Sequence, residues 1–131
     1  MKIGQLSEQT DCKIETIRYY ERIGLLPAPA RSDSGYRIYK TDHVKRLSFI
    51  CRSRELGFTI EEIRALLKMV DGGSYTCNDV KTITLEHLTT IRRKIKDLKK
   101  LETTLSNIAA QCKGNMTPEC PIIDALYQAK D

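Results

Sequence analysis

The sequence predicts a mainly α-helical protein, in which an N-terminal winged helix-turn-helix is followed by a long dimerisation helix forming an antiparallel coiled coil. Three observations predict this fold. Two short amphipathic segments flank a tight turn near the N-terminus, and a loop with Pro and Gly follows them. Residues 77–112 contain neither Pro nor Gly, and apolar residues recur there every three or four positions.

Two short helices are expected first. One covers about 3–10 and, after a turn at Asp11 and Cys12, the other covers about 13–23, where Gly24 ends it as Gly commonly ends a helix. Two short helices joined by a tight turn make a helix-turn-helix unit. Their apolar residues recur at helical spacing: Ile3, Leu6, Ile14, Ile17, Tyr20 and Ile23.

A small hairpin, or wing, is expected next. Residues 25–37 form a loop because they include two prolines and a glycine, and the alternation over 36–39 suits one arm of a hairpin with its tip near Ser34 and Gly35. A helix over about 41–56 then ends before Gly57.

A capping box of Thr59 and Glu62 starts a further helix that reaches Val70, and residues 71–74 break it. The domain boundaries that follow are a winged helix-turn-helix domain at 1–70, a hinge at 71–76, a dimerisation helix at 77–112, and a loop with a short last helix at 113–131. Pro121 suits the first turn of that last helix.

The dimerisation helix needs a partner for its apolar stripe. It is too long to lie over so small a domain, and Ile91, Leu98, Leu105 and Cys112 recur seven residues apart, as in a coiled coil. A homodimer with two-fold symmetry is the commonest solution. A helix folded back on its own domain is the alternative.

Charge and composition narrow the classes of function that this sequence could have. Residues 13–54 hold 10 Lys and Arg against 4 Asp and Glu, and such a basic excess attracts nucleic acid. No run of eighteen apolar residues and no apolar signal region appear, which favours a cytoplasmic location without a membrane span. No nucleophile–base pair, carboxylate pair or phosphate loop suggests an enzyme.

Five cysteines in a cytosolic chain argue against a disulfide framework. Cys12 and Cys51 lie in apolar contexts and are expected to pack. Cys77 and Cys112 lie at opposite ends of the long helix, roughly 52 Å apart at 1.5 Å per residue. They can therefore share a metal ion only across an antiparallel dimer, where Cys77 of one subunit meets Cys112 and Cys120 of the other.

Three thiolates suit a soft metal ion, and a divalent ion leaves less net charge than a monovalent one. The start of the long helix favours the thiolate form of Cys77, as the last helix does for Cys120. A fourth ligand, if zinc needs one, could be water, Asn78 or Glu119. The alternatives are incidental cysteines or a redox regulator with a reversible Cys112–Cys120 disulfide.

The second helix of a helix-turn-helix enters the major groove. Arg and Tyr there and in the wing would bind phosphate oxygens, which fixes register without reading sequence, although the tyrosines could instead pack the wing. The candidates exposed on the second helix include Lys13, Thr16, Arg18 and Tyr19, and those of the loop and wing are Arg31, Tyr36, Arg37 and Tyr39.

The sequence resembles the MerR family of bacterial activators. The motifs are IGQL at 3–6, ETIRYYE at 15–21, GLL at 24–26, RS at 31–32, GYRIY at 35–39 and LGFTIEEI at 56–63. The resemblance implies a winged helix-turn-helix, a long antiparallel dimerisation helix, and DNA contacts from Arg18, Tyr20, Arg31, Tyr36, Arg37 and Tyr39.

The C-terminal part resembles the metal-sensing branch. Cys112 and CPII at 120–123 match its metal-binding loop, whose length here is like that of the Cu⁺ sensors. Cys77 is similar to the sensors of Hg²⁺, Pb²⁺, Cd²⁺ or Zn²⁺, because copper-sensing members carry serine there. The effector implied is a soft divalent ion, with a Cu⁺ sensor as the alternative.

The mechanism that the resemblance implies is distortion of promoter DNA. The homodimer would bind between two promoter elements whose spacer is too long for RNA polymerase. The homodimer and the polymerase would therefore share one promoter. Metal binding would change the angle between the two DNA-binding domains, which then bend and untwist the spacer. The metal must favour one dimer conformation, because equal affinity for both shifts nothing.

Overall fold

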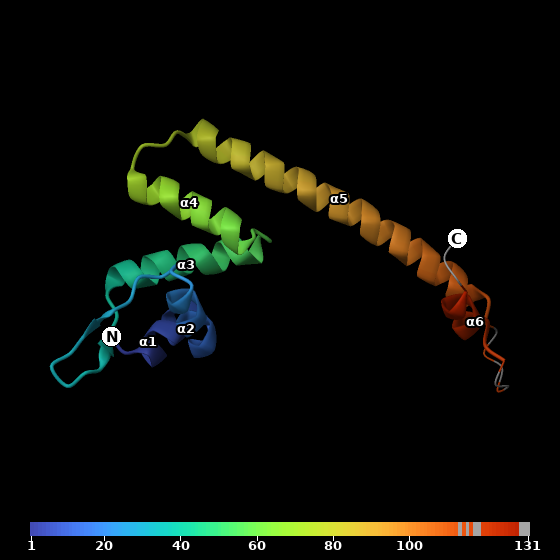
Figure 1. The fold of residues 1–131 in the computed structure, drawn as a ribbon, viewed down its shortest axis with the longest axis horizontal. Coiled ribbons are helices and arrows are strands. Elements are labelled where there is room, and N and C mark those ends of the chain that lie inside the picture. Colours follow the sequence, from blue (N-terminus) through green and yellow to red (C-terminus); the bar gives the residue numbers. More distant parts are fainter. Residues whose placement is uncertain (113, 115, 117–118, 129–131) are drawn as a thin grey trace. The chain divides into compact units, whose positions relative to one another are not determined.

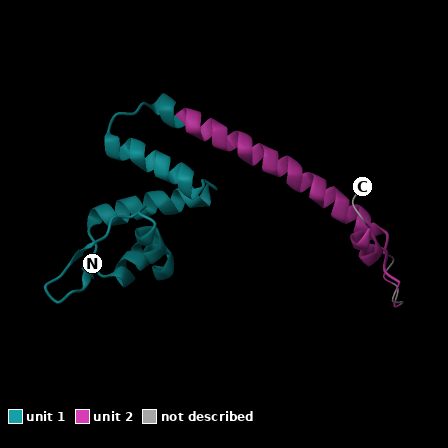
Figure 2. Cartoon of the chain, viewed as in Figure 1, with its two compact units in different colours: residues 1–80 teal, residues 81–131 magenta. Residues whose placement is uncertain are grey.

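A computed structural model describes residues 1–112, 114, 116 and 119–128. The chain forms two compact units, residues 1–80 and residues 81–131 (Figure 2). Six helices and one two-stranded sheet make up the described part, in the order α1–α2–β1–β2–α3–α4–α5–α6 (Figure 1). The mainly helical fold predicted from the sequence is confirmed.

The helix-turn-helix comprises α1 (Ile3–Thr10) and α2 (Ile14–Arg22). The turn between them is tight because Asp11 adopts the left-handed conformation, with φ 54°, and its backbone N–H donates to the Ser7 carbonyl. Lys13 is the N-cap of α2 without a side-chain hydrogen bond, so no capping signal marks this helix in the sequence.

The wing is an antiparallel hairpin of β1 (Ala30–Arg31) and β2 (Arg37–Ile38), with Ala30 opposite Ile38 and Arg31 opposite Arg37. Its tip lies near Ser34 and Gly35, as predicted, because Gly35 takes φ 85° and its N–H donates to the Ser32 carbonyl at 2.8 Å.

Helices α3 (Thr41–Glu55) and α4 (Ile60–Gly72) complete the first unit. The capping box starts α4 as predicted: the Glu62 N–H donates to Thr59 Oγ1 at 3.1 Å, and the Thr59 N–H donates to Glu62 Oε1 at 2.9 Å. Helix α4 runs two residues further than Val70, and Gly73 ends it at φ 66°. The fully buried core gathers side chains from α1 to α4 and from the segments that connect them: Leu6, Ile17, Leu25, Leu26, Tyr39, Leu47, Ile50 and Ile63.

The long helix is α5 (Cys77–Ala110), which ends two residues before Cys112, and the short last helix is α6 (Pro121–Tyr127), with Pro121 in its first turn. Figure 1 shows α5 as a long continuous helix, which α6 follows in the chain. The apolar stripe of α5 is exposed in the single chain: Leu85, Leu88, Ile95, Leu98, Leu101 and Leu105 are all more than a third exposed.

Candidate DNA interface and metal-binding cysteines

Helix α2 turns one face to solvent and one to the core. Ile17 and Tyr20 are buried, whereas Lys13, Arg18 and Tyr19 are exposed and Thr16 is half-buried. The Tyr19 ring lies 5.5 Å from the Arg22 guanidinium, so one aromatic and two cationic side chains share the outer face. This face has the chemistry of a phosphate-binding surface.

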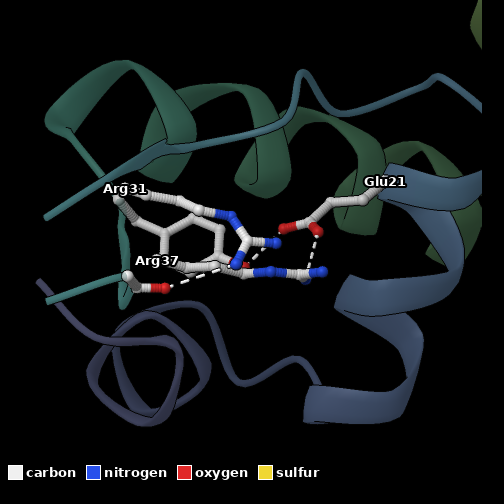
Figure 3. Close-up of polar contacts among 5 residues, drawn as sticks. Glu21, Arg31 and Arg37 are labelled. Carbon is white, nitrogen blue, oxygen red and sulfur yellow. Dashed lines mark hydrogen bonds and ion pairs between the residues drawn. The ribbon is translucent and has the colours of Figure 1, made fainter.

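The wing is fixed to α2 through Glu21, a residue that the sequence analysis did not place among the candidates. Its Oε2 accepts from Arg37 Nη1 at 2.8 Å, and its Oε1 accepts from the Tyr39 hydroxyl at 2.5 Å (Figure 3). Only 9% of the Glu21 side chain is exposed, so this carboxylate is nearly removed from water. Glu21 is therefore one of the residues that hold the wing, together with Met1, whose carbonyl accepts from the Tyr39 N–H at 2.8 Å.

Arg31 and Arg37 are opposite each other across the hairpin, where like charges repel. Glu21 neutralises Arg37, while Arg31 Nη1 donates only to the Gly35 carbonyl, at 3.3 Å, in the contacts drawn (Figure 3). Arg31 is exposed, so it keeps a positive charge at the base of the wing. An anion bound there would relieve the repulsion that remains.

A cavity of about 470 Å³ lies between α2 and the wing, and its charged lining is three arginines around one carboxylate. That excess of positive charge suits a phosphate group. Tyr36 stands further out on the wing, 65% exposed, with the Lys2 ammonium 5.5 Å from its ring centroid. The cavity is lined by Arg18, Glu21, Arg22, Ala28 and Arg37.

Two of the nine DNA-contact candidates are buried. Tyr20 is 7% exposed and Tyr39 is 1% exposed, and the Tyr39 hydroxyl already donates a hydrogen bond to Glu21. Burial, with the hydrogen bond to Glu21, raises the pKa of Tyr39 to about 12. In the free protein, Tyr39 holds the wing in place.

The three candidate metal ligands lie around α5. Cys77 is the first residue of this helix and is exposed. Cys112 follows the last turn of the helix and is half-buried, and Cys120, also half-buried, is the residue just before α6. The loop predicted to surround the metal ion includes residues 113, 115, 117 and 118, which lie outside the described residues. Among the described residues of one chain, no three His, Cys, Asp or Glu side chains gather as a metal site.

Cys12 and Cys51 lie in the first unit, apart from the three candidate ligands. Cys12, in the turn after α1, is 6% exposed, and Cys51, on α3, is half-buried. Burial raises the pKa of both thiols.

No helix in the described part of the chain is long and apolar enough to span a lipid bilayer.

Known proteins resemble this chain over nearly its whole length. Residues 1–70 match the family described as MerR HTH family regulatory protein, and residues 44–108 match the family described as MerR, DNA binding. The mercuric resistance operon regulatory protein of Bacillus cereus is 45% identical over 128 residues, which are 97% of each chain.

Two solved structures resemble the fold and the sequence together. The transcription regulator PbrR691 from Ralstonia metallidurans CH34, in complex with lead(II), is 39% identical with a TM-score of 0.81 and covers 96% of this chain and 98% of its own. The dual function transcriptional regulator MerR from Bacillus megaterium MB1, in complex with mercury(II), is 41% identical with a TM-score of 0.73 and covers 98% and 100%.

Proposed function

Because the chain belongs to the MerR family of helix-turn-helix transcriptional regulators, we propose that it is a promoter-bound homodimer that responds to a soft divalent metal ion. The ion is Hg²⁺, Pb²⁺, Cd²⁺ or Zn²⁺, and Cys77, Cys112 and Cys120 are its ligands. One observation carries the proposal: two of these cysteines flank opposite ends of a continuous 34-residue helix.

The metal site is shared between subunits. A 34-residue helix is roughly 50 Å long, so Cys77 cannot reach Cys112 of its own chain while α5 stays intact. In an antiparallel pair of α5 helices, the start of one meets the end of the other, and the exposed apolar stripe is covered. Three soft thiolates then converge at each end of the pair.

The DNA interface is the outer face of α2 together with the wing. Lys13, Thr16, Arg18 and Tyr19 approach the major groove, and Arg31, Tyr36 and Arg37 approach the neighbouring phosphates. Tyr20 and Tyr39 act from beneath, through their hydroxyls and through the position they give to α2 and the wing. The exposed cations and the arginine-lined cavity support this arrangement.

Metal binding acts on transcription through the dimer. Because each site holds ligands from both chains, the ion selects one relative arrangement of the two α5 helices. The two DNA-binding units then take a new angle and distort the promoter that RNA polymerase shares. This regulator does no covalent chemistry.

Single replacements test the ligands. We expect Cys77→Ser, Cys112→Ser and Cys120→Ser each to abolish metal-dependent transcription in a purified system while the operator affinity of the apo protein stays unchanged. Arg18→Ala is the matched control, which weakens operator binding and leaves metal affinity intact. A disulfide between Cys112 and Cys120 without tight metal binding would instead support a redox regulator, and preference for Cu⁺ would support a copper sensor.

Mixed dimers test the sharing of the site. A Cys77→Ser chain paired with a Cys112→Ser/Cys120→Ser chain regains one complete site per dimer if ligands come from both subunits. We expect the heterodimer, isolated through a different tag on each chain, to hold half of the wild-type metal content. No recovery of metal would contradict the shared site.

A further inference from the structure

We propose that one face of α5 is a second DNA-binding surface, which holds the phosphate backbone of duplex DNA without reading its sequence. This basic face lies within the unit 81–131, and its side chains are all exposed: Arg92, Arg93, Lys96, Lys99 and Lys100. The proposal goes beyond the operator contacts of α2 and the wing, and it uses none of the metal-binding cysteines.

The net positive charge of the chain is concentrated on α5. Residues 92–100 hold six Lys and Arg against one Asp, an excess that equals the net charge of +5 for all 131 residues, so the rest of the chain is balanced. This stretch spans about 12 Å of helix at 1.5 Å per residue. Duplex DNA carries about one negative charge per 1.7 Å of its axis, or roughly seven over that length, so the two charge densities are similar.

The cations of the basic face are not neutralised within the chain. In the part of the chain that the structure describes, none of the five side chains takes part in an ion pair. The hydroxyls of Thr103 and Thr104 beside them are already used, because each donates to the backbone carbonyl four residues earlier at 3.0 Å. The ammonium and guanidinium groups therefore keep their charge for a partner outside the chain.

The basic face stays exposed when α5 pairs through its apolar stripe. Lys96 and Lys100 lie two residues before and two residues after Leu98, and 3.6 residues per turn place both on the opposite side of the helix. A shallow groove of about 580 Å³ follows this side, lined by Lys96, Lys99, Lys100, Thr103 and Thr104. The proposed antiparallel dimer would therefore carry one basic face on each chain.

The chemistry of the groove favours DNA over an acidic protein as its partner. The lining holds no aromatic or aliphatic residue, whereas protein interfaces bury aromatic, Met and Arg anchors and are depleted in Lys. A lysine ammonium is a compact charge on a flexible stem, so it can follow phosphate oxygens without a fixed geometry. Its binding releases counterions condensed on the duplex, which is the source of sequence-independent affinity.

The salt dependence of binding to a non-operator duplex tests the basic face. The basic-face variant is the full chain with Lys96→Gln, Lys99→Gln and Lys100→Gln, which keeps the helix because Gln and Lys have similar helix propensities. Fluorescence anisotropy between about 50 and 200 mM salt gives the slope of log K against log salt. We expect this slope to become shallower by about 0.9 for each lysine that contacts a phosphate, and the affinity at low salt to fall by about tenfold or more.

The matched control removes three exposed lysines elsewhere, as Lys45→Gln, Lys68→Gln and Lys81→Gln in one chain, and so lowers the net charge equally. We expect the slope of this control to stay close to that of the wild type. Equal slopes for the two triple variants would overturn the proposal. An unchanged slope together with lost binding of polyglutamate in the basic-face variant would assign the face to an acidic protein instead.

Circular dichroism and sedimentation equilibrium check that each variant remains a helical dimer. Should the basic-face variant fail this check, Lys96→Gln and Lys100→Gln made singly give the same test, with a change in slope of about 0.9 each. No metal ion and no operator are added, so a wild-type chain without a metal response would count against the proposed function alone.

Discussion

At the scale of single residues, Glu21 organises the proposed DNA-binding surface. Its carboxylate accepts from both Arg37 and Tyr39, so the charge that it neutralises and the tyrosine that it anchors both belong to the wing. Sequence reasoning named Arg37 and Tyr39 by their residue type. Glu21 could have been found from its place in the ETIRYYE stretch, one helical turn after Ile17, where a buried carboxylate needs cationic or hydroxyl partners.

Tyr39→Phe tests this anchor. The ring stays packed, but a hydrogen bond to a charged, largely buried group is lost, which costs about 1.5–3 kcal/mol of unfolding free energy in urea at pH 7. The raised pKa of Tyr39 means that its folded form favours the neutral phenol. The stabilisation of the fold by the neutral Tyr39 phenol is therefore complete below the ordinary pKa of 10.0 and is lost as the pH rises toward about 12.

Tyr36→Phe is the control, since Tyr36 is exposed and should change stability by less than about 0.5 kcal/mol. Equal stability of Tyr39→Phe and wild type at pH 7 would contradict the anchoring role.

At the scale of elements, Arg46 of α3 joins three segments. Its Nε donates to the Leu25 carbonyl at 2.9 Å, and its two terminal nitrogens donate to the Asp71 carboxylate at 2.8 and 3.0 Å. Arg64 of α4 donates to the Ile23 carbonyl at 2.9 Å. These contacts fix the C-terminal end of α2 to α3 and α4. They also explain why α4 includes Asp71, which the sequence analysis assigned to a hinge.

Asp71→Asn tests this link through its pH dependence. Hydrogen bonds from Arg46 lower the pKa of Asp71 below its ordinary value of 3.8. A lowered carboxyl pKa stabilises the fold above that ordinary value, and the stabilisation is lost as the pH falls through the folded pKa. We expect a lower Tm for Asp71→Asn at pH 7, with the difference from wild type shrinking below pH 3.8 in thermal unfolding.

Glu8→Gln, at an exposed position of α1, should show no such pH-dependent difference. A constant difference in Tm between Asp71→Asn and wild type across the acidic range would mean that the ion pair with Arg46 does not cause the loss of stability.

At the scale of the whole molecule, the apolar stripe of α5 is what a dimer has to cover. Leu98 and Leu105 are each 63% exposed in the single chain, two heptad-spaced leucines on one helix face. Burying a leucine side chain contributes about 1.5–3 kcal/mol, so several such residues can hold two chains together.

Leu98→Glu should dissociate the dimer, because it places a charge in the proposed coiled-coil seam. Sedimentation equilibrium should show a monomer with helical circular dichroism, and metal affinity should fall with the loss of the shared site. Lys96→Glu is the control, since 3.6 residues per turn place Lys96 on the opposite face. A Leu98→Glu chain that remains dimeric would contradict pairing through α5.

The sequence by itself determined the helices, the wing and the family. Helix bounds follow from contacts three and four residues apart, and the capping box of Thr59 and Glu62 is read directly from such spacing. The start of α2 was predicted to within one residue, but its cap was not, because Lys13 makes no side-chain cap hydrogen bond.

Only the tertiary structure decided which side chains meet. Glu21 reaches Tyr39 across 18 residues, and Arg46 reaches Asp71 across 25. Local spacing does not encode such contacts, because they form when separate elements pack into one core.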